Sequence, residues 1–340
     1  MFAELLEKLH RRQDLTADEA AAAMGEIMDG RAQPAHIAGL LVGLRMKGER
    51  PAEIVGLARA MRARAVPLTR DVGPVVDTCG TGGDGARTFN VSTAAALALA
   101  GCGARVAKHG NRAVSSRCGS ADVLEQLGVK VDADPAIVER CLEQASIAFF
   151  FAPTFHPSMR HAAATRRELG IRTAFNLLGP LTNPAGASRQ VVGVPRPELT
   201  ELVARSLALL GSDRAWVVHG ADGLDEISTT GYTKVSECHR GAVHTFYVHP
   251  SDFGLAKADV GALAGGDAAL NARIVGDVLA GRPGPSRDIV ALNAGAALFV
   301  AGRAATVREG VALAGAALDE GRAARALEAL VRLSNGEAGS

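Results

Sequence analysis

A glycine-rich segment between two apolar stretches constrains this chain more than any other feature. It reads Asp77-Thr-Cys-Gly-Thr-Gly-Gly-Asp-Gly85 and is followed by Arg87-Thr-Phe-Asn-Val-Ser-Thr93. The preceding run, Pro74-Val-Val-Asp77, is typical of a short buried strand, and residues 92–100 are typical of a small-residue helix. Glycines at such a junction let the backbone approach a ligand closely, and amides of loops and helix N-termini attract anions. The segment therefore predicts a phosphate-binding loop between a strand and a helix.

Two familiar phosphate-binding templates fit this segment poorly. The dinucleotide fingerprint G-x-G-x-x-G is formally present at Gly80, Gly82 and Gly85. That fingerprint requires the helix to begin within it and an acidic residue about 20 residues later. Here the helical pattern begins only near Ser92, and the next strand-like run ends in a lysine. The P-loop template requires Lys-Ser/Thr after its last glycine, where this chain has Ala86-Arg87. A Rossmann fold is therefore a minor alternative.

Composition and charge narrow the class of protein. The chain has 340 residues, 48% of them hydrophobic, which is enough for one large domain or two unequal domains. Its 37 basic and 36 acidic residues give a net charge of +1, so we expect neither a nucleic-acid partner nor a membrane partner. Five scattered cysteines argue against a disulfide framework or a structural zinc site. The sequence shows no signal-peptide pattern and no apolar run long enough to cross a membrane, so we expect a soluble cytoplasmic protein. Residues 289–301 are apolar apart from Asn293, but this run is too short to cross a membrane.

The chain divides into a helical N-terminal part and a longer part in which strands and helices alternate. Residues 1–65 carry helix signals: a capping box at Thr16-Ala-Asp-Glu19, and Pro34 and Pro51 at first-turn positions. From residue 74 onward, short apolar runs alternate with helical patterns, which predicts a mostly parallel central sheet flanked by helices. The candidate strands are residues 74–77, 104–108, 147–151, 190–194 and 215–219, and the candidate helices are residues 92–100, 120–127, 135–145, 158–169 and 197–210.

The predicted fold class is thus α/β, with a small all-helical N-terminal domain and a larger α/β domain. We place the small domain at residues 1–70, completed by helices within about 155–185, and the large phosphate-binding domain at residues 71–340. Residues 229–248 add strand-like runs, and the chain from about 258 to 334 is again helical in pattern. Short amphipathic N-terminal helices must bury their apolar faces, so we expect this part to support a dimer interface as well.

Polar motifs follow the candidate strands, which is where open α/β sheets bind their ligands. After the strand at 104–108, the chain carries Lys108-His-Gly-Asn-Arg112 and then Arg117 and Ser120. Lysine, arginine and serine side chains suit a phosphate or pyrophosphate group, while a solvated basic loop is the alternative. His109 either lines a substrate pocket or orients the loop. The sequence offers no Ser-His-Asp order and no H-E-x-x-H motif, so covalent or acid–base catalysis is not indicated.

Two consecutive acidic residues, Asp225 and Glu226, lie in the glycine-containing loop that begins at His219 and ends at Ser228. Magnesium is usually held by one or two carboxylates together with substrate phosphate oxygens and water. This pair fits that role, and Ser92 could add a hydroxyl ligand, whereas a solvent-facing turn is the alternative. The sequence therefore predicts Mg²⁺ as the cofactor.

Seven ordered motifs together resemble those of the anthranilate phosphoribosyltransferase family, within the wider fold family that includes nucleoside phosphorylases. They are Gly80-Thr-Gly-Gly-Asp84, Asn90-Val-Ser-Thr93, Lys108-His-Gly-Asn-Arg112, Gly119-Ser-Ala-Asp122, Arg167-Glu-Leu-Gly-Ile-Arg-Thr173, Asn176-Leu-Leu-Gly-Pro-Leu-Thr-Asn-Pro184 and Asp222-Gly-Leu-Asp-Glu-Ile-Ser228. The resemblance covers nearly the whole chain. It implies a homodimer of hinged two-domain subunits that transfers the phosphoribosyl group of 5-phosphoribosyl-1-pyrophosphate to the amine of anthranilate, in tryptophan biosynthesis.

The resemblance also implies a role for individual residues. Phosphoribosyl pyrophosphate would be held by Gly80, Gly83, Asp84, Thr88, Asn90, Val91, Ser92, Thr93, Lys108, Ser116 and Ser120. Anthranilate would be contacted by Gly80, His109, Asn111 and Arg166, with Arg166 facing its carboxylate. Magnesium would be bound by Ser92, Asp225 and Glu226, and Lys108 with this acid pair would support the transition state.

Two alternative functions remain at this point. A pyrimidine nucleoside phosphorylase shares the fold and a motif similar to Lys108-His-Gly-Asn-Arg112, but would not be expected to carry the acidic segment 222–228. A non-enzymatic relative that binds nucleic acid would need a strongly basic surface, which a net charge of +1 disfavours.

Overall fold

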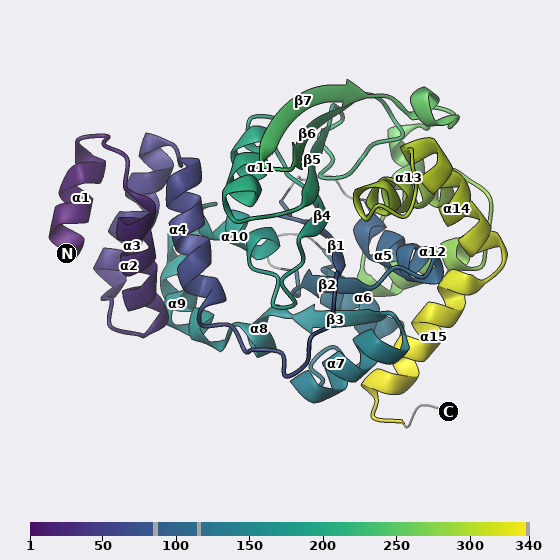
Figure 1. Cartoon of the computed structure of the whole chain (residues 1–340), viewed down its shortest axis with the longest axis horizontal. Helices are drawn as coiled ribbons and strands as arrows, with labels where there is room; N and C mark the ends of the chain where they lie inside the picture. Colours follow the sequence, from purple (N-terminus) through teal and green to yellow (C-terminus); the bar gives the residue numbers. More distant parts are fainter. Residues whose placement is uncertain (84–87, 114–116, 338–340) are drawn as a thin grey trace.

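A seven-stranded sheet forms the centre of the larger part of the molecule (Figure 1). This computed structural model describes residues 1–83, 88–113 and 117–337. The strands lie in the order β3-β2-β1-β4-β5-β6-β7, and the first five in chain order pair in parallel. Their bounds are β1 Val76–Gly80, β2 Val106–Gly110, β3 Ile147–Phe151, β4 Arg189–Gly193 and β5 Arg214–Gly220; the antiparallel pair is β6 Thr233–His239 and β7 Ala242–Val248.

The strand order reverses beside β1, which lies between β2 and β4. In open α/β sheets, ligands bind beyond the carboxyl ends of the strands at such a switch point. Here β1, β2, β4 and β5 each end in glycine. A Cβ on Gly80 would lie 2.4 Å from Asp225 Oδ2, and one on Gly193 only 1.6 Å from the Asp225 carbonyl oxygen. The absence of side chains at the strand ends therefore lets the chain around Asp225 cross closely over the sheet.

Helices cover both faces of the sheet. One face packs on α5 Val91–Gly101 and α13 Pro285–Val300, with the C-terminal helices outside them (Figure 1). The other face packs on α11 Leu199–Leu209. The remaining helices of this part are α6 Ser120–Gln126, α7 Pro135–Gln144, α8 Ala152–Phe155, α12 Ala268–Leu279, α14 Val307–Asp319 and α15 Arg322–Ser334, and the 3₁₀ helices are η1 Pro157–Met159, η2 Pro250–Phe253 and η3 Val260–Leu263.

Alternating residues of the sheet belong to different hydrophobic cores. On β4 and β5, Val191 and Trp216 join the core around α5 and α13, whereas Val192 and Val217 join a second core that includes the N-terminal helices. This alternation follows from the two-residue repeat of a β-strand. The helical N-terminal part is therefore packed as a continuation of the core on one face of the sheet.

Four helices, α1 Phe2–His10, α2 Ala17–Met28, α3 Pro34–Lys47 and α4 Pro51–Arg62, form the N-terminal part (Figure 1). The predicted capping box is confirmed, because Thr16 Oγ1 accepts from the Glu19 amide at 3.2 Å and Glu19 accepts from the Thr16 amide at 2.9 Å. α2 and α4 approach closely at Gly56, where a Cβ would lie 2.1 Å from the Ala17 carbonyl oxygen. Two later helices, α9 Arg160–Leu169 and α10 Phe175–Leu181, pack against this group. The domain boundary at residues 70 and 71 stays a prediction.

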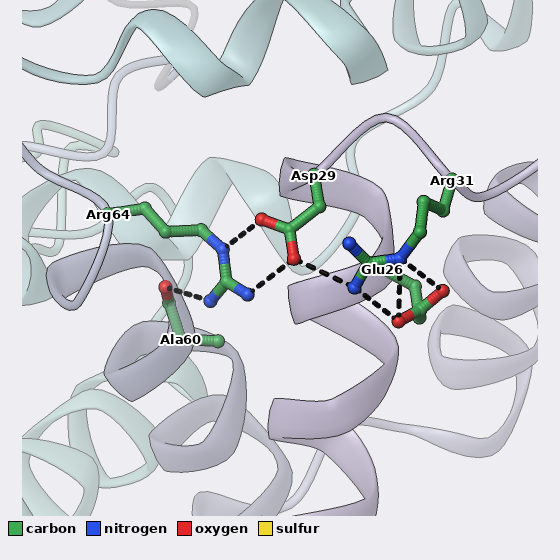
Figure 2. A network of polar contacts seen from close by, with 5 residues as sticks. All are labelled: Glu26, Asp29, Arg31, Ala60 and Arg64. Atoms are coloured by element: carbon green, nitrogen blue, oxygen red, sulfur yellow. Dashed lines mark hydrogen bonds and ion pairs between the residues drawn. The ribbon is translucent and has the colours of Figure 1, made fainter.

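Charged side chains tie the end of α2 to the end of α4 (Figure 2). The Arg64 guanidinium donates to both carboxylate oxygens of Asp29, at 2.6 and 2.8 Å, and to the Ala60 carbonyl at 3.2 Å. Arg31 bridges Glu26 and Asp29 on the other side of the network. These contacts hold the two helix ends in a fixed relative position.

A second polar cluster in the N-terminal part is buried. The Glu53 side chain is 0% exposed, and its carboxylate accepts from the amides of Leu15 and Arg50, each at 2.8 Å. Lys47 Nζ donates to the same carboxylate at 3.1 Å. The buried charge is thus fully surrounded by donors, and it joins the start of α4 to the turn before α2.

The predicted strands are present, but two of them begin and end later than expected. β1 and β2 extend to Gly80 and Gly110, because pairing continues from Thr78 with Val191 and from His109 with Phe150. Lys108 is a strand residue as predicted, and the strand continues through His109 and Gly110, which the sequence placed after it. Ser120 is the first residue of α6, and Gly119 precedes it as the N-cap. No helix in the described part of the chain is long and apolar enough to cross a membrane.

Candidate active site

Two adjoining clefts open at the carboxyl edge of the sheet. The first, of about 310 Å³, lies between the glycine loop after β1, the N-terminus of α5, the segment from β2 to α6, and Asp225-Glu226. The second, of about 470 Å³, lies between the ends of β1 and β2 and the helices α8, α9 and α10. They share the wall residues Cys79, Gly80, Thr81, His109, Gly110, Asn111 and Asn176.

Asp225 and Glu226 bind two different elements of the first cleft. Asp225 Oδ2 accepts from the Gly82 amide at 3.1 Å, and Glu226 Oε1 accepts from the Ser92 amide at 3.0 Å. Ser92 is in the first turn of α5, whose unpaired amides favour negative charge. The acid pair therefore faces the glycine loop and the helix N-terminus across the cleft, which is incompatible with the solvent-facing turn considered from the sequence.

Lys108 lies beneath the first cleft with only 3% of its surface exposed. Its Nζ donates to the Thr78 carbonyl at 2.7 Å and to Ser92 Oγ at 3.4 Å. Burial lowers the pKa of Lys108, and the nearby carboxylates of Asp77 and Glu226 oppose that shift. The ammonium group is thus held at the floor of the cleft by β1 and α5.

Two buried asparagines on C-terminal helices position residues of the first cleft. Asn293, on α13, accepts from the Ile227 amide and donates to the Ile227 carbonyl, both at 2.9 Å, and so holds the peptide that follows Glu226. Asn271, on α12, donates to Asn90 Oδ1 at 2.9 Å. Sequence reasoning assigned neither residue a role. The signal available was that Asn293 interrupts an otherwise apolar run.

Two histidines form part of the wall of the second cleft. The rings of His109 and His156 lie with their centroids 5.2 Å apart. His109 Nδ1 lies 3.1 Å from the Gly179 carbonyl and His156 Nε2 lies 3.0 Å from the Thr182 carbonyl, so each of these nitrogens carries the proton. Among the described residues, His109 Nε2 and His156 Nδ1 have no hydrogen-bond partner. Burial lowers the pKa of His109 to about 3 and that of His156 to about 4, which keeps both rings neutral at pH 7.

Arg166 extends from α9 to the second cleft, where its guanidinium carbon lies 5.0 Å from the centre of the Phe175 ring. Burial lowers its pKa, but arginine remains charged at any physiological pH. Within the described residues, no carboxylate pairs with Arg166. A half-buried guanidinium beside an aromatic ring and next to neutral histidines is suited to a ligand that is both aromatic and anionic.

The first cleft brings together all the described residues expected to hold phosphoribosyl pyrophosphate. They are Gly80, Gly83, Thr88, Asn90, Val91, Ser92, Thr93, Lys108 and Ser120. Asp84 and Ser116 lie outside the described residues. Gly80, His109, Asn111 and Arg166, expected to contact anthranilate, all line the second cleft. The loop arginine Arg112 lines the first cleft but pairs with Glu125 at 2.7 Å and with Asp122 at 3.3 Å. The charge of Arg112 is therefore already largely neutralised.

The donor set of the first cleft suits a hard cation that also binds phosphate. No three His, Cys, Asp or Glu side chains gather as a metal site within residues 1–83, 88–113 and 117–337. Asp225 and Glu226 instead provide two carboxylates, with the Ser92 backbone bound to one of them. Magnesium is commonly held in this way, with the remaining positions filled by phosphate oxygens and water. The two carboxylates are thus compatible with a cation whose remaining ligands come from a phosphate group and water.

Comparison with known proteins agrees with this geometry. Residues 3–65 match a family model described as the helical bundle domain of a glycosyl transferase family, and residues 72–324 match the model of its a/b domain. A protein of Moorella thermoacetica named anthranilate phosphoribosyltransferase is 56% identical over 331 residues, covering 97% of this chain and 98% of that protein.

Solved structures give the same result. The crystal structure of anthranilate phosphoribosyltransferase from Thermus thermophilus has a TM-score of 0.92 and 46% identity, covering 97% of this chain and 99% of that one. The enzyme of Saccharomyces cerevisiae in complex with PRPP and Mg has a TM-score of 0.88 and 28% identity, covering 98% of both chains. The likeness thus extends over both clefts and the helices that form them.

Proposed function

The chain belongs to the anthranilate phosphoribosyltransferase family, and from this premise we propose how its two clefts divide the reaction. The enzyme transfers the phosphoribosyl group of 5-phosphoribosyl-1-pyrophosphate to the amine of anthranilate, in tryptophan biosynthesis. The observation that carries our proposal is the shared wall of the clefts, at Gly80, His109 and Asn111. One side of this wall offers phosphate-binding groups, and the other offers a guanidinium beside an aromatic ring.

Phosphoribosyl pyrophosphate is assigned to the first cleft. The glycine loop around Gly80 and Gly83 and the first turn of α5, at Asn90 to Thr93, supply backbone amides for phosphate oxygens. Thr88 and Ser120 add hydroxyl groups, and Lys108 adds a buried positive charge. Asp84 and Ser116 are assigned to the same substrate on the family resemblance.

Magnesium is assigned to Ser92, Asp225 and Glu226. These residues fit the ion, because two carboxylates and a hydroxyl are hard oxygen donors that face the phosphate cleft. When bound, Mg²⁺ would neutralise the charge that develops on the departing pyrophosphate. Asn293 holds the Ile227 peptide next to this acid pair and thereby limits the movement of both carboxylates.

Anthranilate is assigned to the second cleft. The Arg166 guanidinium suits its carboxylate, and the Phe175 ring that stacks on Arg166 provides an aromatic surface. His109 and Asn111 line the wall shared with the first cleft, where the amine must meet the ribose. Because the His109 ring is neutral with its proton on Nδ1, it adds no charge at this point.

In the reaction, the bond from ribose C1 to the pyrophosphate oxygen breaks and a bond from C1 to the anthranilate nitrogen forms. The transition state resembles an oxocarbenium ion, as in glycoside hydrolysis. The aromatic amine is already neutral at pH 7, so it attacks without a strong base and releases its proton afterwards. Lys108 and the acid pair with its cation support charge on the pyrophosphate side. The remaining rate enhancement comes from positioning of the two substrates, which meet at the residues that line both clefts.

The assembly and location of the enzyme are further parts of this proposal. We assign it as a cytoplasmic homodimer that associates through the N-terminal helices, which lie at the end of the molecule away from the C-terminal helices (Figure 1). Light scattering on the purified protein would test this, since a monomeric mass at micromolar concentration is incompatible with the dimer.

The test of the substrate assignment is a fluorescence assay with purified protein. We expect anthranilate fluorescence to decrease only when phosphoribosyl pyrophosphate, magnesium and protein are all present. Arg166→Gln should raise the KM for anthranilate about tenfold to a hundredfold, because it removes a charge-assisted hydrogen bond. The KM for phosphoribosyl pyrophosphate should change much less. Equal increases in both KM values would contradict the division into two clefts, and conversion of a nucleoside by inorganic phosphate would instead support a phosphorylase.

A further inference from the structure

We propose that Arg172 binds the pyrophosphate of phosphoribosyl pyrophosphate and stabilises it as it leaves. The inference rests on the proposed assignment of that substrate to the first cleft. Arg172 comes from the turn between α9 and α10, far in sequence from the glycine loop, yet it lines the first cleft. The motif that contains it, Arg167 to Thr173, has no role in the assignments above.

The turn that carries Arg172 is fixed on both sides. α9 ends at Gly170, which adopts a left-handed conformation with a φ of 61°. On the other side, the Thr173 amide donates to Asn176 Oδ1 at 2.9 Å at the start of α10. The side chain is therefore projected from a defined backbone position, which is a requirement for a residue that orients a substrate.

The Arg172 side chain reaches across to the glycine loop after β1. Its Nη2 donates to the Thr81 carbonyl at 3.3 Å. A Cβ built on Gly83 would lie 1.5 Å from Arg172 Nη1, so this space is available to the guanidinium only because residue 83 is glycine. The guanidinium thus lies against the backbone of the loop assigned to the phosphates.

The charge of the first cleft suits a guanidinium beside the phosphates. Arg112 is paired with Asp122 and Glu125, and Lys108 is buried at the floor. Arg172 is the further cation among the described residues lining this cleft. A guanidinium has five N–H donors in a planar fork, so it can hold the Thr81 carbonyl and a phosphate oxygen together.

The place of Arg172 in the chain also connects the two substrates. Arg166, assigned to the anthranilate carboxylate, is on the helix that ends at Gly170, and Asn176 lines both clefts. Arg172 would therefore hold the pyrophosphate beside the turn that leads to Asn176, a residue in the wall of both clefts.

Two substitutions separate charge from structural support. Arg172→Lys keeps the positive charge, whereas Arg172→Gln removes it, and each retains an N–H donor for the Thr81 carbonyl. We expect Arg172→Gln to weaken binding of inorganic pyrophosphate with magnesium, measured by calorimetry, about tenfold to a hundredfold. The KM for phosphoribosyl pyrophosphate should rise in parallel and kcat should fall. Arg172→Lys should lie between the wild type and Arg172→Gln.

Arg167→Gln is the matched control, because Arg167 is an exposed arginine in the same motif that lines neither cleft. It should leave pyrophosphate binding and the KM unchanged. Equal effects of Arg172→Lys and Arg172→Gln, or unchanged pyrophosphate binding with a lowered Tm, would overturn the proposal and leave Arg172 as a structural support of the glycine loop. Failure of the wild-type protein to consume anthranilate would refute the proposed reaction. The calorimetric measurement of pyrophosphate binding does not depend on that reaction, so the two failures can be told apart.

Discussion

The helical N-terminal part and the carboxyl edge of the sheet treat buried polar groups in opposite ways. In the helical part, the carboxylate of Glu53 is surrounded by donors from Leu15, Lys47 and Arg50. At the edge of the sheet, buried polar atoms of Thr81, Thr93, His109 and His156 have no partner among the described residues. These are four of the seven such buried atoms, and all four residues line the two clefts.

This difference indicates a structural role for the helical part and a ligand-binding role for the edge of the sheet. A buried polar group without a partner destabilises the folded chain, so native proteins retain such groups mainly where a ligand or water satisfies them. The helical part uses its buried carboxylate, and the surface network around Asp29 and Arg64 in Figure 2, to hold its own helices together. At the sheet edge, four buried polar atoms instead stay unpaired within the described part of the chain, in residues that line the clefts. Substitutions in the two regions should therefore affect different measurements.

The largest effect is expected from the acid pair of the first cleft. Replacing Asp225 by Asn and Glu226 by Gln in one variant should lower kcat about a thousandfold, because the charge that we assign to magnesium binding is lost while the shape is kept. The free energy of unfolding should change little. A steady-state fluorescence assay and urea unfolding measure the two quantities on the same protein.

The matched control for that variant is the acid pair at the C-terminal end of α14. Asp319 pairs with Arg287 and Glu320 with Arg322, and neither acid lines a cleft. Converting both acids to amides makes the same change in net charge and should leave kcat unaltered. Full activity of the Asp225→Asn, Glu226→Gln variant would refute the metal assignment, and an equal loss in both variants would show that net charge alone matters.

The reverse pattern is expected from Glu53. Glu53→Ala should lower the free energy of unfolding by about 3 kcal/mol, because it leaves the amides of Leu15 and Arg50 without their acceptor and removes one of the two carboxylates that the largely buried Lys47 contacts. At 25 °C the folded fraction should retain the wild-type kcat and KM. Urea unfolding and kinetics on the same preparation check both points. A loss of kcat without a loss of stability would contradict the separation of the two regions.

A smaller effect is expected on the pH dependence of stability, through the buried His156 beside the second cleft. The pKa of His156 is lowered to about 4 by burial, below its ordinary value of about 6.5, so acid favours the unfolded chain, which binds the proton. Stability associated with the neutral ring is complete above pH 6.5 and is lost as the pH falls toward 4. At pH 5 this loss is about 2 kcal/mol. His156→Gln, which keeps the donor to the Thr182 carbonyl, should reduce the difference in unfolding free energy between pH 7 and pH 5 by about that amount. An undiminished difference would show that other groups dominate the acid response.

Much of the fold and of the site was predictable because the signals were local. The capping box at Thr16, the first-turn prolines and the alternation of apolar runs depend on neighbouring residues. The glycine loop and the acid pair were recognisable as motifs for the same reason. The ends of β1 and β2 were predicted incorrectly, because polar residues such as Thr78 and His109 remain in the strands only through pairing with neighbouring strands.

The sequence by itself determined the α/β class, the helical N-terminal part and the identity of the groups that we assign to phosphate and metal. These features follow from residue periodicity, turn chemistry and the chemistry of side chains. Only the tertiary structure decided which of those groups meet: His109 with Gly179, Asn293 with Ile227, and Arg172 with Thr81. Each of these contacts joins residues at least 66 positions apart. Packing of the helices on the sheet creates them, and no local pattern in a single sequence records that packing.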